Sequence, residues 1–215
     1  MAREMPDLPR SKLLQLIGLQ AAVFTFHGAV CWWASGRALA EFVVFDLRDL
    51  GLGVALGAGM SAAAWASFRL FPRAGEALMR MQAPTYPFLK DRLGPGAVIF
   101  VSLCAGIGEE ALYRGGAQSW MSDYIGPAPG IAVAALIFTV SHMARPPVAA
   151  IIFAIGILFG AIFWYTGSLL IVMVGHAVYD VFALAYLQDR LHALGVFDTA
   201  DETSEATGET ENAID

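Results

Sequence analysis

The feature that most constrains this chain is a stretch of 34 residues, Pro146 to Tyr179, without a single Asp, Glu, Lys or Arg. At a rise of about 1.5 Å per residue, a transmembrane helix needs about 20 predominantly apolar residues. The stretch therefore accommodates most of two helices, joined by Thr166-Gly167-Ser168. Charged residues make up only 15% of the whole chain, whereas soluble domains carry about 25%. The sequence thus predicts a polytopic membrane protein.

Six apolar segments are long enough to be read as spans, and together they predict the fold class. None shows the alternating pattern of a membrane β-strand, so we expect an all-α bundle of about six transmembrane helices. The segments are 13–34, 50–71, 95–119, 129–146, 147–166 and 168–188. Gly and Ala recur through 51–64, which favours close helix packing there.

The Lys and Arg residues outside the spans predict the orientation. Ten fall on the side of the N-terminus, and two, Arg37 and Arg48, fall on the other side. By the positive-inside rule, both termini are expected in the cytoplasm. The ten are Arg3, Arg10, Lys12, Arg69, Arg73, Arg80, Lys90, Arg92, Arg145 and Arg190.

Composition divides the chain into three regions. Residues 1–94 are predicted to form a two-helix membrane region with a basic connection, and 95–190 a second helix bundle. Residues 198–215 hold seven acidic and no basic residues, which predicts a disordered tail. The connection at 73–93 is basic and interrupted by two prolines, and its sequence is equally compatible with a helix on the inner membrane surface and with a solvated loop.

Ionisable residues within the spans are the candidates for function, because a charge at the bilayer centre costs about 2.5–3.5 kcal/mol. Glu110 and Arg114 are four residues apart, and so are His176 and Asp180, so each pair shares a helix face. Glu109 has no intrahelical partner of opposite sign. With His142 these residues supply a base, imidazoles and a cation, which is the set that water activation needs. His27, alone in the first span, is predicted to be a hydrogen-bonded core residue.

Three motifs in this set resemble those of the CPBP family of intramembrane proteases, which includes CAAX proteases and bacteriocin-processing enzymes. GEEALYRG (Gly108–Gly115) is similar to the family's E-E-x-x-x-R motif, FTVSH (Phe138–His142) to F-x-x-x-H, and HAVYD (His176–Asp180) to H-x-x-x-N/D. Order, spacing and placement on separate spans all agree. The resemblance covers about residues 95–188.

The resemblance implies a glutamate-dependent intramembrane endopeptidase, and it assigns roles residue by residue. Glu109 would be the general base that activates water, held in place by Glu110 and Arg114. His142 and His176 would bind the water, the oxyanion or a metal. Asp180 departs from family members that carry Asn, because an ionised carboxylate cannot donate a hydrogen bond to an oxyanion. It would instead orient His176 or ligate a metal.

The cofactor is left open by the sequence. Glu109, Glu110 and Asp180 against Arg114 leave a formal charge of about −2 in a poorly solvated site, which a protonated carboxyl, a histidinium or a divalent cation would compensate. His142, His176 and Asp180 form a plausible set of ligands for one zinc ion, with a position open for water. The same residues also support metal-free chemistry.

Two other functions are compatible with the same buried residues. A proton-coupled transporter would also bury Glu, His and Asp, although no inverted repeat is present; a non-catalytic membrane scaffold of the same family is the second alternative. Counted from the cytoplasmic helix ends, Glu109 would lie about 21 Å deep but His142 only about 5–8 Å, a difference in depth that does not suit a common site.

The expected partners are the lipid bilayer and a membrane-associated peptide or protein substrate, not nucleic acid. The expected location is a bacterial inner membrane.

Overall fold

The computed structural model describes residues 9–197, and this part of the chain is helical without a strand. The predicted disorder of 198–215 falls outside the described residues. The longer helices are α1 (Arg10–Ala34), α2 (Leu47–Leu70), α3 (Pro72–Gln82), α4 (Pro95–Glu110), α6 (Pro127–Ser141), α7 (Pro146–Thr166) and α8 (Leu169–Ala193). The shorter elements are η1 (Leu39–Glu41), η2 (Ala83–Thr85), η3 (Pro87–Leu89), the π-helical η4 (Ala111–Gln118) and α5 (Ser119–Ile125).

Five helices in the described residues are long and apolar enough to cross a membrane. They are α1, α2, the continuous rod Pro95–Ile125, α7 and α8. The predicted all-α membrane bundle is therefore confirmed, and the chain is an integral multi-pass membrane protein. The remaining predicted span, 129–146, corresponds to α6, which has only 15 residues and is about 22 Å long. The predicted number of six spans is thus not confirmed, and the orientation of the termini stays a prediction.

The two ends of α7 show why the helices stop where they do. At its C-terminal end the predicted turn at 166–168 is confirmed, because Gly167 adopts a left-handed φ of 69° and Ser168 caps α8 by accepting from the Ile171 amide. At its N-terminal end, α7 begins at Pro146, one residue before the predicted start. The predicted end of the preceding span at 146 is wrong, because α6 ends at Ser141. Pro146 and Pro147 do not end the preceding helix but begin α7, where the first turn needs no amide hydrogen.

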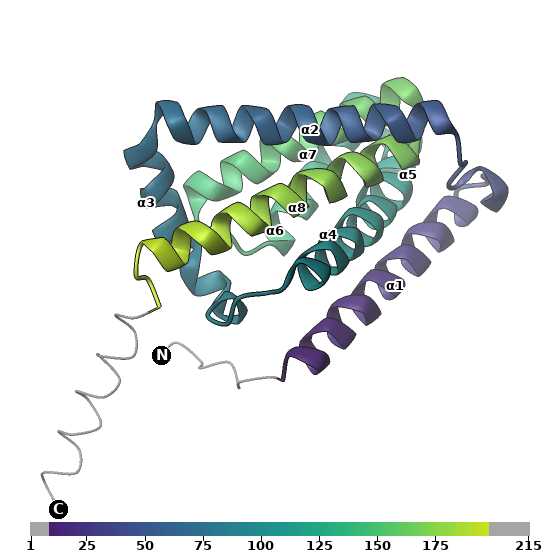
Figure 1. Ribbon diagram of the computed structural model, residues 1–215. Helices are drawn as coiled ribbons and strands as arrows, with labels where there is room; N and C mark the ends of the chain where they lie inside the picture. Colours follow the sequence, from purple (N-terminus) through teal and green to yellow (C-terminus); the bar gives the residue numbers. More distant parts are fainter. Residues whose placement is uncertain (1–8, 198–215) are drawn as a thin grey trace, which may run out of the picture.

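α8 is the central helix of the bundle, with α2 and α4 packed along it (Figure 1). The close approach of α2 and α4 to α8 depends on glycine residues. A Cβ added at Gly57 of α2 would lie 2.6 Å from the carbonyl oxygen of Gly175, and one at Gly106 of α4 would lie 2.6 Å from that of Met173. The close packing predicted for 51–64 is thus observed. α1 lies on the outer side of α4 and η4.

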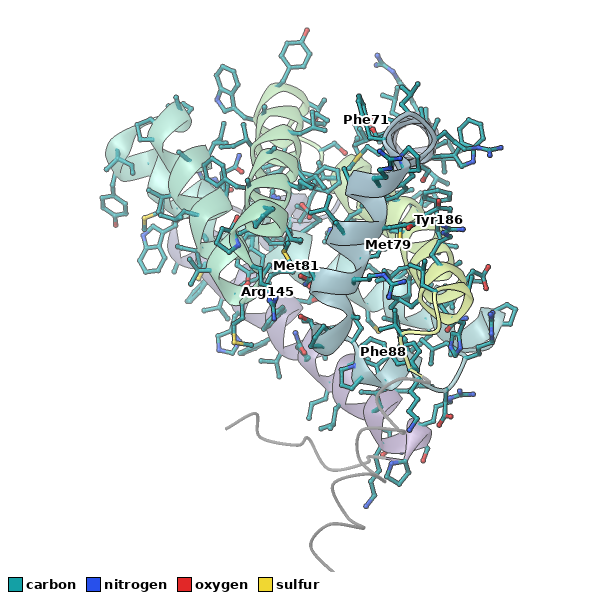
Figure 2. The ribbon with its side chains drawn as sticks, turned by 90° about the vertical axis from the view of Figure 1, so that its left-hand side faces the viewer. Phe71, Met79, Met81, Phe88, Arg145 and Tyr186 are labelled. Atoms are coloured by element: carbon teal, nitrogen blue, oxygen red, sulfur yellow. The ribbon has the colours of Figure 1, made fainter. Side chains whose placement is uncertain are left out.

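The connection between α2 and α4 covers one end of the bundle. Figure 2, which views this end, shows α3 crossing it from Phe71 towards Phe88, with Met79 on the side of Tyr186 and Met81 on the side of Arg145. Met79, Ala83 and Leu89 are buried in one cluster with Leu191. Of the two possibilities left open by the sequence, a solvated loop does not describe this packed segment. The cluster is completed by Leu93 and Val98.

Candidate active site

A cavity of about 630 Å³ opens within the bundle, beneath the segment that follows α3. Its walls come from α1, α4, α6, α7 and α8, and residues of η2 and η3 close it at one side. Four candidate residues from three different helical segments line this one cavity: Glu109, His142, His176 and Asp180. The structure therefore brings together residues that are up to 71 positions apart in the sequence.

Glu109 and Glu110 are the last residues of α4, and the backbone changes immediately after them. The following eight residues, Ala111–Gln118, form a π-helix. Such wide turns are rare and occur frequently at functional sites. The apolar run 95–119 predicts one regular helix, and this π-helical segment departs from that prediction. The adjacent pair Gly115-Gly116 is the only local signal of irregular backbone.

Arg114 and Glu110 form an ion pair with almost no contact with solvent, since their side chains are 1% and 0% exposed. Arg114 Nη1 donates to Glu110 Oε1 at 2.9 Å, and Nη2 donates to the Gly156 carbonyl at 3.3 Å. The guanidinium also lies over the rings of Phe138 and Phe159, at 4.6 and 5.5 Å from their centroids. The buried charge is thus compensated by a carboxylate, a carbonyl and two aromatic faces.

His176 is oriented by the same carboxylate. Its Nδ1 lies 2.8 Å from Glu110 Oε1, and because a carboxylate accepts, Nδ1 carries the proton. The ring stacks on Phe159 at 5.4 Å. Nε2 then faces the cavity, 3.5 Å from Asp180 Oδ2 and 3.9 Å from Glu109 Oε2. A neutral His176 therefore presents a bare nitrogen towards both carboxylates.

His142 is oriented in an analogous way from another element. It is the residue that follows α6, and its Nδ1 donates to the Phe138 carbonyl at 2.7 Å. Its Nε2 lies 3.8 Å from Glu109 Oε2. The two imidazoles thus aim their Nε2 atoms at the same carboxylate oxygen. Both Nδ1 protons are already used by acceptors.

The distances of 3.8 and 3.9 Å from Glu109 Oε2 are too long for direct hydrogen bonds. One water at about 2.8 Å from each atom fits such a separation, and polar groups this far apart are commonly bridged by water. A tetrahedral zinc ion with bonds of about 2.0–2.2 Å holds its ligand atoms roughly 3.3–3.6 Å apart; of the predicted ligands, His176 Nε2 and Asp180 Oδ2 are 3.5 Å apart. Within residues 9–197, no group of three or more His, Cys, Asp or Glu side chains is arranged to hold a metal ion. The distances from Glu109 Oε2 to the two Nε2 atoms therefore fit a bridging water better than a metal ion bound by all three atoms.

The short α6 removes the depth difference predicted for His142. α4, η4 and α5 run on to Ile125, and α6 returns antiparallel from Pro127. Because α6 ends after 15 residues at Ser141, His142 lies about as far from this reversal as Glu109 does. The error came from assuming that α6 spans the whole bilayer.

Other residues noted in the sequence lie apart from the site. His27 is exposed, and its Nδ1 donates to the carbonyl of Val23 in its own helix at 2.7 Å. Its predicted position in the core is therefore wrong, although the predicted hydrogen bond is present. Cys31 and Cys104 are free.

Tyrosines were missed as part of the cavity wall. Tyr86, Tyr113 and Tyr179 all line it, and Tyr113 donates to Ser141 Oγ at 2.8 Å. None of the three is a defining position of the motifs, and Tyr86 lies in a connection between helices. Only the fold places it in the wall of the cavity that contains Glu109 and Asp180.

Comparison with known proteins supports the motif assignment. Residues 92–182 match the model of one family, described as type II CAAX prenyl endopeptidase, Rce1-like. Searches of curated proteins and of solved structures found no match. The matched range contains all three motifs and every candidate site residue. The segment that builds the cavity's carboxylate and histidine cluster is therefore Rce1-like, which confirms the predicted resemblance to the CAAX proteases and indicates an intramembrane endopeptidase.

Proposed function

We propose that this protein hydrolyses a peptide bond of a membrane-associated substrate, using water activated by Glu109. The observation that carries the proposal is the approach of two imidazole Nε2 atoms to Glu109 Oε2, at 3.8 and 3.9 Å, inside one cavity. A water between these groups donates one proton to Glu109 and the other to an imidazole. Its lone pair then points away from them, towards a bound carbonyl carbon.

The reaction needs only proton transfers through Glu109. Glu109 takes a proton from the water as the oxygen attacks the carbonyl carbon, which gives a tetrahedral oxyanion. Glu109 then returns the proton to the peptide nitrogen as the C–N bond breaks, leaving a carboxylic acid and an amine; the acid then gives its proton to the amine, so that the final products are a carboxylate and an ammonium group. Glu110 and Arg114 act through their bonds to each other and to His176, so they are positioning residues. Asp180 Oδ2 lies 3.5 Å from His176 Nε2.

A divalent ion on His142, His176 and Asp180 is the second candidate, in keeping with the −2 charge of the site. The observation favouring it is the bond between His176 Nδ1 and Glu110, because metal-binding histidines commonly donate their other nitrogen to a carboxylate. When bound, such an ion would lower the pKa of its water. The distances from Glu109 Oε2 to the two Nε2 atoms support water activation by Glu109 and do not involve the ligands of such an ion, apart from the two imidazoles.

The family description suggests the first substrate to test, a prenylated peptide of the CAAX type. An internally quenched S-farnesyl peptide and its unprenylated counterpart should be incubated with the protein in vesicles. In parallel, new C-termini should be mapped in membranes of cells that produce the wild type or Glu109→Gln. We expect fragments that depend on Glu109, with cleavage reduced about 10²–10⁴-fold in Glu109→Gln because the base is lost and the size kept.

The alternatives predict different results. A transporter would produce no Glu109-dependent fragment but would move protons or solute across vesicles, and Glu109→Gln would stop the flux. A scaffold would do neither. The absence of any fragment in both assays refutes the proposed function.

A further inference from the structure

Peptide hydrolysis at this site would create an oxyanion, and the inner part of the site has no spare donor for it. Arg114 is committed to Glu110 and the Gly156 carbonyl. The Nδ1 atoms of both histidines are bound, and a neutral Nε2 only accepts. Asp180 stands where family members with Asn would offer an amide, and an ionised carboxylate only accepts. With both imidazoles neutral and Asp180 ionised, the cluster therefore suits proton abstraction but lacks a group that stabilises negative charge on the substrate oxygen.

Hydroxyl groups on the cavity wall are the remaining donors to consider. Tyr113 donates to Ser141 Oγ, and Ser141 donates to the Phe138 carbonyl, so both are committed. Tyr86 and Tyr179 are left, together with Thr85, which is exposed at the cavity edge and has an aliphatic hydroxyl, a weaker donor than a phenol. Both tyrosines interact electrostatically with Asp180, and Tyr86 also interacts with Glu109. Tyr86 thus lies within electrostatic range of both Glu109 and Asp180.

The environment of Tyr86 keeps it a donor. Burial, with a contribution from the nearby Asp180 carboxylate, raises the pKa of the Tyr86 phenol above its usual value near 10. The hydroxyl therefore stays protonated throughout the neutral range. Gln82 Oε1, on the neighbouring buried side chain, has no hydrogen-bond partner among the described residues. The Tyr86 ring lines the cavity and its hydroxyl donates to none of the described residues, so the O–H is available to a bound substrate.

We propose that Tyr86 is a catalytic residue whose hydroxyl donates a hydrogen bond to the oxyanion formed when water attacks the substrate carbonyl. This proposal rests on the proposed function. The bond forms as the carbonyl oxygen becomes negative and is released when the C–N bond breaks, without net proton transfer to or from Tyr86. Tyr86 precedes the family-matched range of 92–182, so this chain supplies from its α3–α4 connection the donor that Asp180 does not provide.

The test compares Tyr86→Phe with the wild type on whichever peptide or membrane protein the wild type cleaves. The substitution removes one oxygen and keeps the ring that packs edge-on against Phe88 at 5.8 Å, so folding is expected to be unchanged in gel filtration and thermal unfolding. We expect kcat to fall about 10²–10³-fold with KM nearly unchanged, as for other oxyanion donors. A change in KM alone would assign Tyr86 to substrate binding and overturn the proposal.

Two further variants make the test specific. Tyr165→Phe is the control, because Tyr165 is 87% exposed and outside the cavity, and it should cleave like the wild type. Tyr179→Phe should cost less than Tyr86→Phe; the reverse order would identify Tyr179 as the donor and reject Tyr86. If Glu109→Gln abolishes cleavage but Tyr86→Phe cleaves normally, only this inference fails. If the wild type cleaves nothing, both proposals fail.

Discussion

Glu110 is the residue on which the geometry of the site depends. A single oxygen, Oε1, accepts from Arg114 Nη1 at 2.9 Å and is 2.8 Å from His176 Nδ1. The carboxylate thereby fixes which nitrogen of His176 faces Glu109. Two adjacent glutamates consequently have separate tasks, because one faces the cavity and the other is fully buried among its partners.

Replacing Glu110 by Gln should damage stability as well as activity. The change leaves the buried Arg114 without a compensating charge, and breaking such a pair costs about 3–5 kcal/mol. The free energy of unfolding can be measured by denaturant titration in micelles. Asp189→Asn is the matched control, because its pair with Arg92 is exposed on both sides and should be worth less than about 1 kcal/mol. Equal losses in the two variants would contradict the structural role of Glu110.

The same cluster of side chains determines whether the active protein contains a metal ion. If the water is activated by Glu109 without a metal, protein purified without a chelator or a polyhistidine tag should be active with a stoichiometry near zero by elemental analysis. A strong chelator should then leave cleavage unchanged. One zinc per active protein, with activity lost to the chelator and restored by zinc, would instead establish the metal-dependent form. Asp180→Asn should lower the affinity for the ion only in that case.

Among the elements, the π-helix η4 and its contact with α1 position the end of α4. A Cβ built at Gly28 of α1 would lie 2.1 Å from the carbonyl oxygen of Ala111, the first residue of η4. The two backbones therefore touch directly where the chain leaves Glu110. The predicted division of the chain at residue 94 stays a prediction, but α1 is packed against the segment that carries the site.

Gly28→Ala should separate α1 from η4 and disturb the site. Because the new methyl group meets backbone rather than a flexible side chain, we expect a loss of about 1–3 kcal/mol or more in stability, together with reduced cleavage. Gly59→Ala in α2 is the control. Its Cβ would meet no atom within 4 Å, so stability should be unchanged or rise by up to about 1 kcal/mol. A Gly28→Ala protein as stable and active as the control would show that the contact is not needed.

For the whole molecule, the predicted orientation places the α3 end of the bundle in the cytoplasm. Arg73 and Leu39 lie at opposite ends of α2 and are exposed, so single cysteines at these positions report the two sides. In a background with Cys31 and Cys104 replaced by Ser, a membrane-impermeant maleimide should label Leu39→Cys in intact cells. It should label Arg73→Cys only after permeabilisation. The opposite pattern would show that the positive-inside interpretation is wrong.

The fold class and the motif residues follow from the sequence itself, because the free-energy cost of placing polar groups in hydrocarbon restricts which segments can cross the membrane. An uncharged run such as Pro146–Tyr179 predicts membrane helices, and the ionisable side chains of the three motifs within such helices mark the site, whereas His27 lies apart from it. The motif residues and the turn at 166–168 could therefore be predicted, since they depend on local spacing and on Gly and Ser.

The tertiary structure decided what depends on contacts between distant segments. The early end of α6 places His142 beside Glu109, although helix length could not be read from an apolar run that continues to Pro146 and Pro147. The π-helix η4 begins where its backbone contacts α1. This contact joins Gly28 and Ala111, which are 83 residues apart in the sequence. Tyr86 reaches the cavity only because the α3–α4 connection is buried against α8. Local pattern determines which segments enter the membrane, whereas packing determines which of their side chains meet.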